Sequence, residues 1–276
     1  MNPHAPAPVS PRALLRSLWC NRDLILQMTR RDVIGRYKGS VMGLVWSLAN
    51  PILLLAMYTL VFSVVFKARW GGGEQESRAQ FAILLFIGMI VHGLFAETLT
   101  RAPSLILANV SYVKKIVFPL EILPVVAMGA SLFHAAISLL VLAAAMLLFN
   151  GFLPWQALFL PLVLLPLVVL ALGLAWLLAS LGVFLRDVAQ PIGLAMTILL
   201  FASPVFYPVS ALPAEVRPWL ILNPLTFIIE QARAVLISGR LPDMAGLLVY
   251  SCVAAIAAWI GYGWFQKTRK GFANVL

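Results

Sequence analysis

Residues 41–66 read VMGLVWSLANPILLLAMYTLVFSVVF, an unbroken apolar run without a single formal charge. A helix that crosses the hydrocarbon layer of a membrane needs about 20 such residues, whereas the core of a water-soluble domain does not. Two further uncharged runs lie between Glu121 and Arg186 and between Met244 and Gln266.

The chain is 62% hydrophobic and only 11% charged. Soluble domains carry about 25% charged residues. These features predict an all-α polytopic membrane protein and not a β-barrel, because barrel strands alternate apolar and polar residues.

Six segments are long enough and apolar enough to cross a membrane as helices. The uncharged run after Glu121 is too long for one crossing. It is interrupted at Asn150, Gly151 and Pro154, residues that favour a tight turn between two helices. The six predicted spans are residues 41–66, 80–100, 117–149, 155–185, 189–208 and 244–266.

Lys and Arg are divided unevenly between the two sides of this predicted topology. An even number of spans places both termini on the same side. That side carries 14 of the 20 Lys and Arg residues, and the opposite side carries six. Because basic residues accumulate on the cytoplasmic side, both termini are predicted to be cytoplasmic. Topology and anionic lipid also account for the net charge of +10, so no nucleic-acid partner is expected.

The N-terminal segment, residues 1–40, is predicted to be a cytoplasmic arm followed by an amphipathic helix in the membrane interface. Residues 41–276 form the six-helix transmembrane domain. On a helix over residues 12–30 the polar side chains Arg12, Arg16, Asp23 and Arg30 gather on one face. The apolar side chains on the opposite face are Leu14, Leu18, Ile25 and Met28.

Basic residues become dense where the chain enters the first span. This basic cluster consists of Arg30, Arg31, Arg36 and Lys38. Such a cluster can anchor anionic lipid headgroups, at about 1 kcal/mol per residue. It could also bind the pyrophosphate of a lipid-linked substrate, which Arg grips through paired hydrogen bonds. Charge alone leaves both interpretations open.

The cytoplasmic loop between the second and third spans is predicted to hold a short helix that begins at Pro103. Its apolar residues Leu105, Ile106 and Val110 would pack against the transmembrane domain. A short helix held between two spans is suited to docking a soluble partner, although a plain amphipathic connector fits the spacing equally well. The residues expected to face the cytoplasm are Asn109, Tyr112, Lys114 and Lys115.

Residues 209–243 do not fit a simple loop. Two apolar stretches, Ala211–Leu222 and Leu225–Ile237, are predicted to be short half-helices that enter the outer leaflet and return. Charges make a full crossing costly, at about 2.5–3.5 kcal/mol each near the bilayer centre. The segment is interpreted as an external gate, and an amphipathic periplasmic cap is the alternative. The charged residues of this predicted gate are Glu215, Arg217, Glu230 and Arg233.

Three aromatic residues recur every fourth position on one face of the first predicted span. They are Tyr58, Phe62 and Phe66. Aromatic faces offer a non-directional surface on which the apolar faces of sugar rings could slide. Packing against neighbouring helices or lipid is the alternative.

Candidates for catalysis or metal binding are few. His92 and His134 stand in apolar runs without Cys or carboxylate at metal-ligand spacing, so buried hydrogen bonding is expected of them. Glu97 and Arg101 are four residues apart and are predicted to pair with each other. Gly71-Gly72-Gly73 lacks the rest of a phosphate-binding loop. The sequence thus indicates no catalytic site, no metal site and no bound cofactor, and any energy for transport would come from another subunit or an ion gradient.

Eight short motifs follow one another along the chain. In order they are Arg30-Arg31-Asp32-Val33, Arg36-Tyr37-Lys38-Gly39-Ser40, Gly43-Leu44-Val45-Trp46, Asn50-Pro51, Lys114-Lys115-Ile116-Val117-Phe118-Pro119, Phe184-Leu185-Arg186-Asp187, Ser203-Pro204-Val205-Phe206-Tyr207 and Asn223-Pro224-Leu225. In identity and order they resemble permeases of the ATP-binding-cassette polysaccharide export family. Members of that family export lipopolysaccharide O-antigen, capsule or teichoic acid, and the likeness to the O-antigen exporters is strongest.

The resemblance implies a homodimer in the bacterial inner membrane, paired with two ATPase subunits that bind ATP and Mg²⁺. It implies a lipid-linked glycan as substrate, a channel at the dimer axis, and reception of the lipid pyrophosphate by the basic cluster. Residues 103–115 would be the coupling helix that docks the ATPase. Tyr58, Phe62 and Phe66 would line the channel, and residues 209–238 would be the periplasmic gate.

Two other functions remain alternatives. An exporter of the same architecture could carry a small drug or lipid, for which a narrow channel without aromatic lining would be expected. A membrane enzyme of glycan synthesis would need an acid, base or metal constellation and large polar loops, and neither is visible in the sequence. A passive channel is disfavoured because the interface helix and cytoplasmic loop suggest a docked motor.

Overall fold

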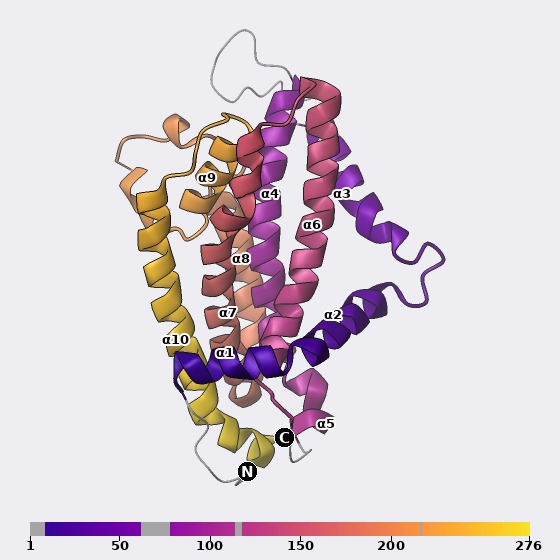
Figure 1. The fold of residues 1–276 in the computed structure, drawn as a ribbon, viewed down its shortest axis with the longest axis vertical. Helices are drawn as coiled ribbons and strands as arrows, with labels where there is room; N and C mark the ends of the chain where they lie inside the picture. The colour runs from indigo at the N-terminus through magenta and orange to yellow at the C-terminus, as the bar shows by residue number, and fades with distance from the viewer. Residues whose placement is uncertain (1–8, 62–77, 114–117, 216) are drawn as a thin grey trace.

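The computed structural model describes residues 9–61, 78–113, 118–215 and 217–276 (Figure 1). Every regular element within these ranges is a helix, which confirms the predicted all-α class. The α-helices are α1 (Pro11–Cys20), α2 (Arg22–Tyr37), α3 (Val45–Tyr58), α4 (Arg78–Arg101), α5 (Val110–Val113), α6 (Ile122–Asn150), α7 (Leu160–Phe184), α8 (Ala189–Ala202), α9 (Thr226–Leu236) and α10 (Met244–Val275). The 3-10 helices are η2 (Ala102–Ser104), η3 (Leu107–Asn109), η4 (Trp155–Phe159), η5 (Arg186–Val188), η6 (Val209–Ala211) and η7 (Arg217–Leu222).

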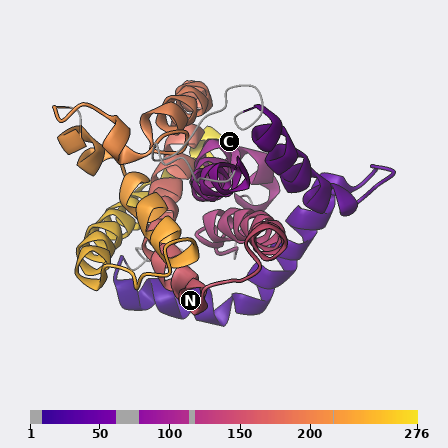
Figure 2. The ribbon, with the colours of Figure 1, turned by 90° about the horizontal axis from the view of Figure 1, so that it is seen from above.

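Four helices in the described ranges are long and apolar enough to cross a membrane, and they stand side by side in the bundle (Figures 1 and 2). They cover Gln80–Ser104, Ile122–Phe149, Trp155–Phe184 and Met244–Val275. Long apolar helices therefore cover the second, fourth and sixth predicted spans and residues 122–149 of the third. The first is represented by the shorter apolar helix Val45–Val61, and the fifth by α8, which ends before the predicted boundary.

The helix α4 forms the centre of the bundle. Its most apolar window is 78% buried, against 22% for the corresponding windows of α6 and α10. It packs against α3, α6, α7, α8 and α9. A helix that is apolar all round needs protein or lipid on every side. Protein supplies most of that contact for α4, whereas α6 and α10 leave wide apolar faces open.

Local residues explain where the long helices end and how closely they pack. The predicted turn at Asn150-Gly151 is confirmed, because α6 ends at Asn150 and Gly151 has a φ of 75°, which favours glycine. At the crossing of α7 and α10, a Cβ atom on Gly261 would overlap the carbonyl of Gly173. Small residues of this kind let membrane helices approach closely. The two helices are thereby held at backbone contact.

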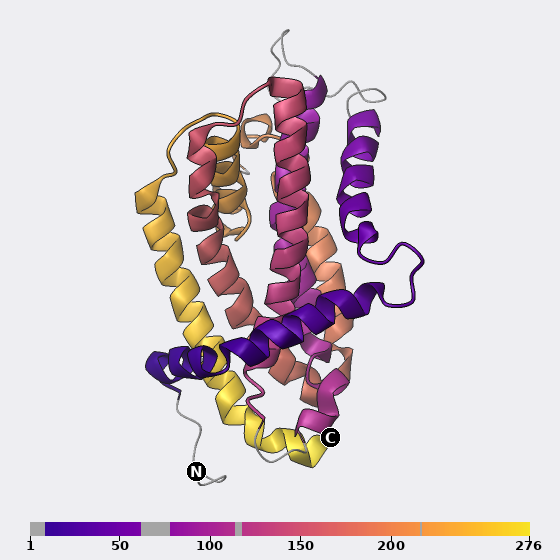
Figure 3. The same cartoon turned by 45° about the vertical axis from the view of Figure 1, so that its right-hand side comes forward.

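The amphipathic N-terminal segment forms two helices that run across the bundle instead of along it (Figures 1 and 3). The predicted single helix is interrupted at Asn21 and continues to Tyr37. Its apolar face packs against protein: Met28 is 7% exposed, and Leu14, Leu18 and Ile25 are partly buried beside the same core. The helices α1 and α2 lie at the end of the bundle that also holds the C-terminus of the chain (Figure 1).

The segment between α8 and α10 differs from the predicted pair of half-helices. The second half-helix exists as α9, which is buried through Ile228, Ile229 and Val235. The first was wrong as a continuous helix, since η6 ends at Ala211 and the 3-10 helix η7 begins only at Arg217. Prolines at 213 and 218 each lack a backbone donor, which weakens a regular helix there.

Candidate functional site

The candidate site lies where α2 crosses the end of α4, beside the chain that leaves α4. This chain, residues 102–113, is called the connecting segment; it comprises η2, η3 and α5 and is not the single helix expected from Pro103. Of the three apolar residues predicted to face inward, Leu105 and Ile106 are buried, 9% and 0% exposed, and Val110 is half-buried. Pro103 lies so close to Gly182 of α7 that a Cβ on this glycine would overlap the Pro103 carbonyl. The connecting segment is thus seated directly on the transmembrane bundle.

Two ion pairs join α2 to α4. Arg101 Nη2 donates to both carboxylate oxygens of Asp32 at 2.8 Å, and Arg36 Nη2 lies 2.6 Å from Glu97 Oε1. The four side chains are only 24–30% exposed. The predicted pairing of Glu97 with Arg101 was wrong, because each residue finds its partner on α2. This group of four, Asp32, Arg36, Glu97 and Arg101, is called the clasp.

His134 of α6 extends the clasp into a polar network. Its Nδ1 lies 3.1 and 3.2 Å from the two carboxylate oxygens of Glu97, and its Nε2 lies 3.3 Å from the Tyr37 hydroxyl. Burial raises the pKa of Tyr37 above its usual range, so this hydroxyl stays protonated and can donate. The buried hydrogen-bonding role expected of the histidines is confirmed here and at His92, whose Nε2 lies 2.9 Å from the Met196 carbonyl oxygen.

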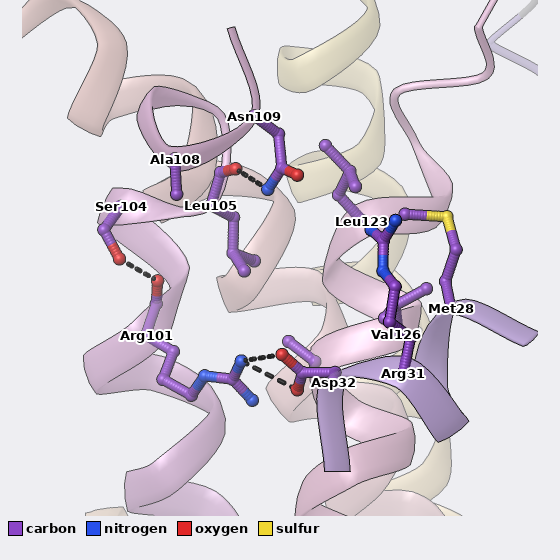
Figure 4. Close-up of a pocket in the computed structure, with 11 residues that line it drawn as sticks. Met28, Arg31, Asp32, Arg101, Ser104, Leu105, Ala108, Asn109, Leu123 and Val126 are labelled. Atoms are coloured by element: carbon purple, nitrogen blue, oxygen red, sulfur yellow. Dashed lines mark hydrogen bonds and ion pairs between the residues drawn. The ribbon is translucent and has the colours of Figure 1, made fainter. Parts of the chain in front are cut away.

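A pocket of about 170 Å³ separates α2 from the connecting segment (Figure 4). Arg31 and Asp32 approach from α2, and Arg101 and Asn109 from the opposite side. Arg31 Nη2 also donates to the hydroxyl of Tyr112 at 3.1 Å. The remaining lining residues are Met28, Ser104, Leu105, Ala108, Leu123, Val126 and Ala127.

The basic cluster is divided by these contacts into two sets. All four residues are exposed, but Arg36 is also held by Glu97 and Arg31 also bonds to Tyr112. All four residues are on α2 or at its C-terminal end. Arg30 and Lys38 therefore remain accessible to an anion, and Arg36 can take one only by giving up or sharing its carboxylate.

The other residues predicted to dock a partner or line a channel are placed as follows. Asn109 donates to the Leu105 carbonyl at 2.8 Å, and Tyr112 stacks on Phe118 with ring centroids 4.3 Å apart. Tyr58 is half-buried near the end of α3. The residues that lie outside the described ranges are Lys114, Lys115, Phe62 and Phe66.

The four charged residues of the predicted gate do not form one group. Arg233 is 5% exposed and donates to the carbonyls of Leu84, Pro204 and Val205 over 2.7–3.2 Å, as well as to Glu230. Arg217 is exposed and donates to two carbonyls of its own loop, and Glu215 is exposed. Arg233 therefore joins α4, α9 and the chain after α8, whereas the first two charges lie at the surface. Arg233 is 28 residues from Val205 and 149 residues from Leu84 in the sequence, which explains why helical periodicity gave no sign of these contacts.

Sequence reasoning gave no role to Asp32 or Glu121 and the wrong partner to Glu97, although these three acidic residues organise this end of the protein. Asp32 and Glu97 hold the clasp, and the third, Glu121, is 7% exposed and lies 2.8 Å from Arg269 Nη1. Ser17 donates to the other Glu121 oxygen at 2.8 Å. A carboxylate amid basic residues, as in Arg30-Arg31-Asp32, was the available signal. Carboxylates buried this far need a partner cation.

No group of three His, Cys, Asp or Glu side chains in the part of the chain that the structure describes could hold a metal ion. The charged groups at this site are fixed ion pairs and exposed cations. Such an arrangement can bind anions and lock helices together.

Comparisons with known proteins agree with this architecture. The ABC-2 type transporter family matches residues 23–237, from the first turn of α2 to the end of α9. The O-antigen export system permease protein RfbA of Myxococcus xanthus is 27% identical over 95% of this chain and 98% of its own length. A protein of the same name from Klebsiella pneumoniae is 26% identical over 92% and 95%. The polysialic acid transport protein KpsM of Escherichia coli is 20% identical over 87% and 91%. Since the family match spans most of the chain, including both helices that build the clasp and three of the four long helices, the chain belongs to the ABC-2 type transporter family.

Proposed function

We propose that this chain is the transmembrane permease subunit of an ATP-driven exporter of lipid-linked polysaccharide of the O-antigen type. The observation that carries the proposal is the alignment, over nearly their full length, with relatives named as O-antigen export permeases. The substrate would move from the cytoplasm to the periplasm. The chain itself would be a transport subunit without catalytic activity.

The physical chemistry of a glycan explains why such a subunit is needed. Each hydroxyl that enters hydrocarbon without a hydrogen-bond partner costs several kcal/mol, on the order of 4–8 by alkane transfer. A polymer of many sugars therefore cannot cross bare lipid. A channel at the axis of a homodimer would supply the path, and closed twofold symmetry would suit it. In this arrangement Tyr58, Phe62 and Phe66 would line the path.

The proposed topology has six spans, with both termini in the cytoplasm and the protein in the bacterial inner membrane. The four long helices and the two shorter apolar helices α3 and α8 support it. The clustering of α1, α2, the connecting segment and the C-terminus at one end is in line with the basic residues counted on that side (Figure 1). The segment over residues 209–238 would then be the periplasmic gate.

The proposed partners are a second copy of the chain and two ATPase subunits that bind ATP and Mg²⁺. The connecting segment is the docking site that we propose for the ATPase. It is seated on α7 through Pro103 and lies at the end of the bundle that holds the C-terminus. Closure of the ATPase pair on ATP would shift this segment and the helices that follow it as rigid bodies.

The exposed cations of the basic cluster are proposed to receive the pyrophosphate of the lipid carrier. Arg30 and Lys38 support this role because both are exposed. Arg31 lies in the pocket beside the connecting segment. Arg36 would contribute only by sharing its bond with Glu97.

The proposal is tested by locating the glycan in a bacterial strain that lacks this chain. Surface glycan is stained in intact cells and total glycan in permeabilised cells, before and after the chain is restored. Lipid-linked polymer trapped inside the cells, and released to the surface on restoration, is the expected result. Loss of all polymer would instead indicate an enzyme of glycan synthesis. A normal surface glycan would show that another substrate, such as a small lipid or drug, is exported.

A further inference from the structure

The clasp joins the proposed substrate end of the protein to the proposed motor end. Asp32 and Arg36 are one helical turn apart on α2, and Glu97 and Arg101 are one turn apart on α4. The pairs form crosswise, the earlier residue of one helix with the later residue of the other. Each helix therefore contributes one acidic and one basic residue, and each of the four charges is paired with an opposite charge on the other helix.

This arrangement fixes the register of the two helices. If α2 slid by one turn along its own axis, either Arg36 would meet Arg101 or Asp32 would meet Glu97. Like charges at such distances repel, and at 24–30% exposure water screens them less than at an open surface. The clasp thus specifies one relative position of α2 and α4 and disfavours its neighbours.

A second set of contacts ties the start of α6, at the other end of the chain between α4 and α6, to α1. Glu121 at the start of α6 accepts from Ser17 of α1 and from Arg269 of α10, both at 2.8 Å. Arg269 also donates to the carbonyl of Phe118 at 2.8 Å. This group, Ser17, Glu121 and Arg269, is called the Glu121 anchor.

The chain between these two fixed points includes the connecting segment. It leaves α4 directly after Arg101 of the clasp and enters α6 directly after Glu121 of the anchor. Arg31 adds a third link, through its hydrogen bond to Tyr112 inside the segment. The interface helices α1 and α2 are consequently bonded before, within and after the proposed ATPase-docking region.

We propose that the clasp transmits movement of the connecting segment to α2, and with it to the exposed Arg30 and Lys38 that would hold the substrate headgroup. Asp32, Arg36, Glu97 and Arg101 are positioning residues in this mechanism, and none of them need touch the substrate. The inference rests on the proposed function, because it assumes an ATPase at one end and an anionic lipid at the other. A coupling of this kind acts through rigid bodies held in register.

Charge reversal with restoration tests the proposal in the complete transporter, co-expressed with its ATPase subunit. The variants are Asp32→Arg, Arg101→Asp and the double exchange of both. Each is assayed for surface glycan, for ATPase that co-purifies with the permease, and for ATP hydrolysis. Export in each single variant should fall about tenfold or more while assembly and ATP hydrolysis persist, and the double exchange should recover most of it. Asp23→Arg is the matched control, because Asp23 is on the same helix with a side chain that is 84% exposed.

A chemical cross-link covers the case in which the single variants do not fold. Cys20 and Cys252 are replaced by Ser, Asp32→Cys and Arg101→Cys are introduced together, and a short bismaleimide bridges the new thiols. If α2 and the end of α4 move as one body, the cross-linked transporter should keep exporting glycan. Arrest of export by the cross-link would overturn the proposal.

Other outcomes also decide against it. Normal export in both single variants would show that the clasp transmits nothing. Loss of export together with loss of the ATPase, without recovery in the double exchange, would reduce the clasp to a folding contact. Failure of the proposed function appears separately, as a surface glycan that does not depend on the unmutated chain at all.

Discussion

At the scale of single residues, buried charge is placed where many backbone acceptors converge. The Arg233 guanidinium donates to three carbonyls and one carboxylate within 3.2 Å, and the residue is only 5% exposed. A guanidinium has five donors in a planar fork and can satisfy such a cage, whereas an ammonium cannot match its geometry. Arg233 thereby fixes α9 against α4. The neighbouring Gly88 leaves room for it, since a Cβ there would lie 3.2 Å from Arg233 Nη2.

Replacement of this arginine should destabilise the bundle. In Arg233→Leu the carbonyls of Leu84, Pro204 and Val205 lose their donor, at a cost of about 3 kcal/mol or more. We expect a lower melting temperature for the purified protein in detergent and a smaller loss for Arg233→Lys. Arg217→Leu is the control, because Arg217 is exposed and bonds only within its own loop. Equal melting temperatures for the two leucine variants would contradict this role.

At the scale of elements, the protein uses small residues where two backbones must touch. The connecting segment is seated at Gly182 on α7, and α7 itself is seated at Gly261 on α10. The same helix therefore supports the proposed docking region on one side and the last span on the other. Side chains at either glycine would have to push backbone aside, which close-packed interiors resist.

A larger residue at Gly182 should displace the connecting segment. In Gly182→Val the added side chain collides with Pro103, so η2 must lift off α7. We expect less ATPase to co-purify with the permease and export to fall accordingly, while the protein still inserts into the membrane. Gly193→Val on α8 is the matched control, because a Cβ there meets nothing within 4 Å. Undiminished co-purification in Gly182→Val would argue against this segment as the docking site.

At the scale of the whole molecule, one end of the bundle carries the interface helices α1 and α2, and the chain that follows α8 is irregular. The interface helices, the clasp and the Glu121 anchor lie with the C-terminus at one end (Figures 1 and 3). Beyond α8, residues 203–215 and 217–225 form turns and 3-10 helices before the buried α9. Wide apolar faces remain open on α6 and α10. Lipid or a second copy of the chain would cover them.

Thiol labelling can test the proposed orientation of this bundle. Cys20 is exposed on α1, and Glu215→Cys places a second thiol on the exposed loop after α8. With Cys252 replaced by Ser, a membrane-impermeant maleimide should label position 215 once the outer membrane is opened. Cys20 should react only after the inner membrane is also opened. The reverse order would contradict cytoplasmic termini.

Local features of the sequence predicted local features of the fold. Hydrophobic run lengths indicated the four long helices, Asn150-Gly151 indicated a turn, and period 3.6 identified the buried face that contains Met28. Each of these signals depends on residues close together in the chain. Helix propensity and burial of an apolar face act over the same short range, so the sequence contains them directly.

Contacts across long sequence distances were beyond such reasoning. Glu97 and Arg101 looked like partners at helical spacing, yet each pairs across more than 60 residues with α2. The first half-helix, predicted over residues 211–222, looked apolar enough to form, yet η7 begins only at Arg217 and most of the described residues of this stretch are exposed. The pairing of Glu97 and Arg101 with α2 depended on which other element lay alongside.

The sequence by itself determined that this protein is a helical membrane protein with an amphipathic, basic N-terminal segment, because hydrophobicity and periodicity are properties of neighbouring residues. Only the tertiary structure decided which charges meet. The clasp, the Glu121 anchor and the cage around Arg233 exist because side chains of α2 reach the end of α4 and because α9 packs against α4 and α7 at particular positions. A buried or half-buried charge takes the partner that the packing of helices brings within reach, and that packing is settled by the whole chain.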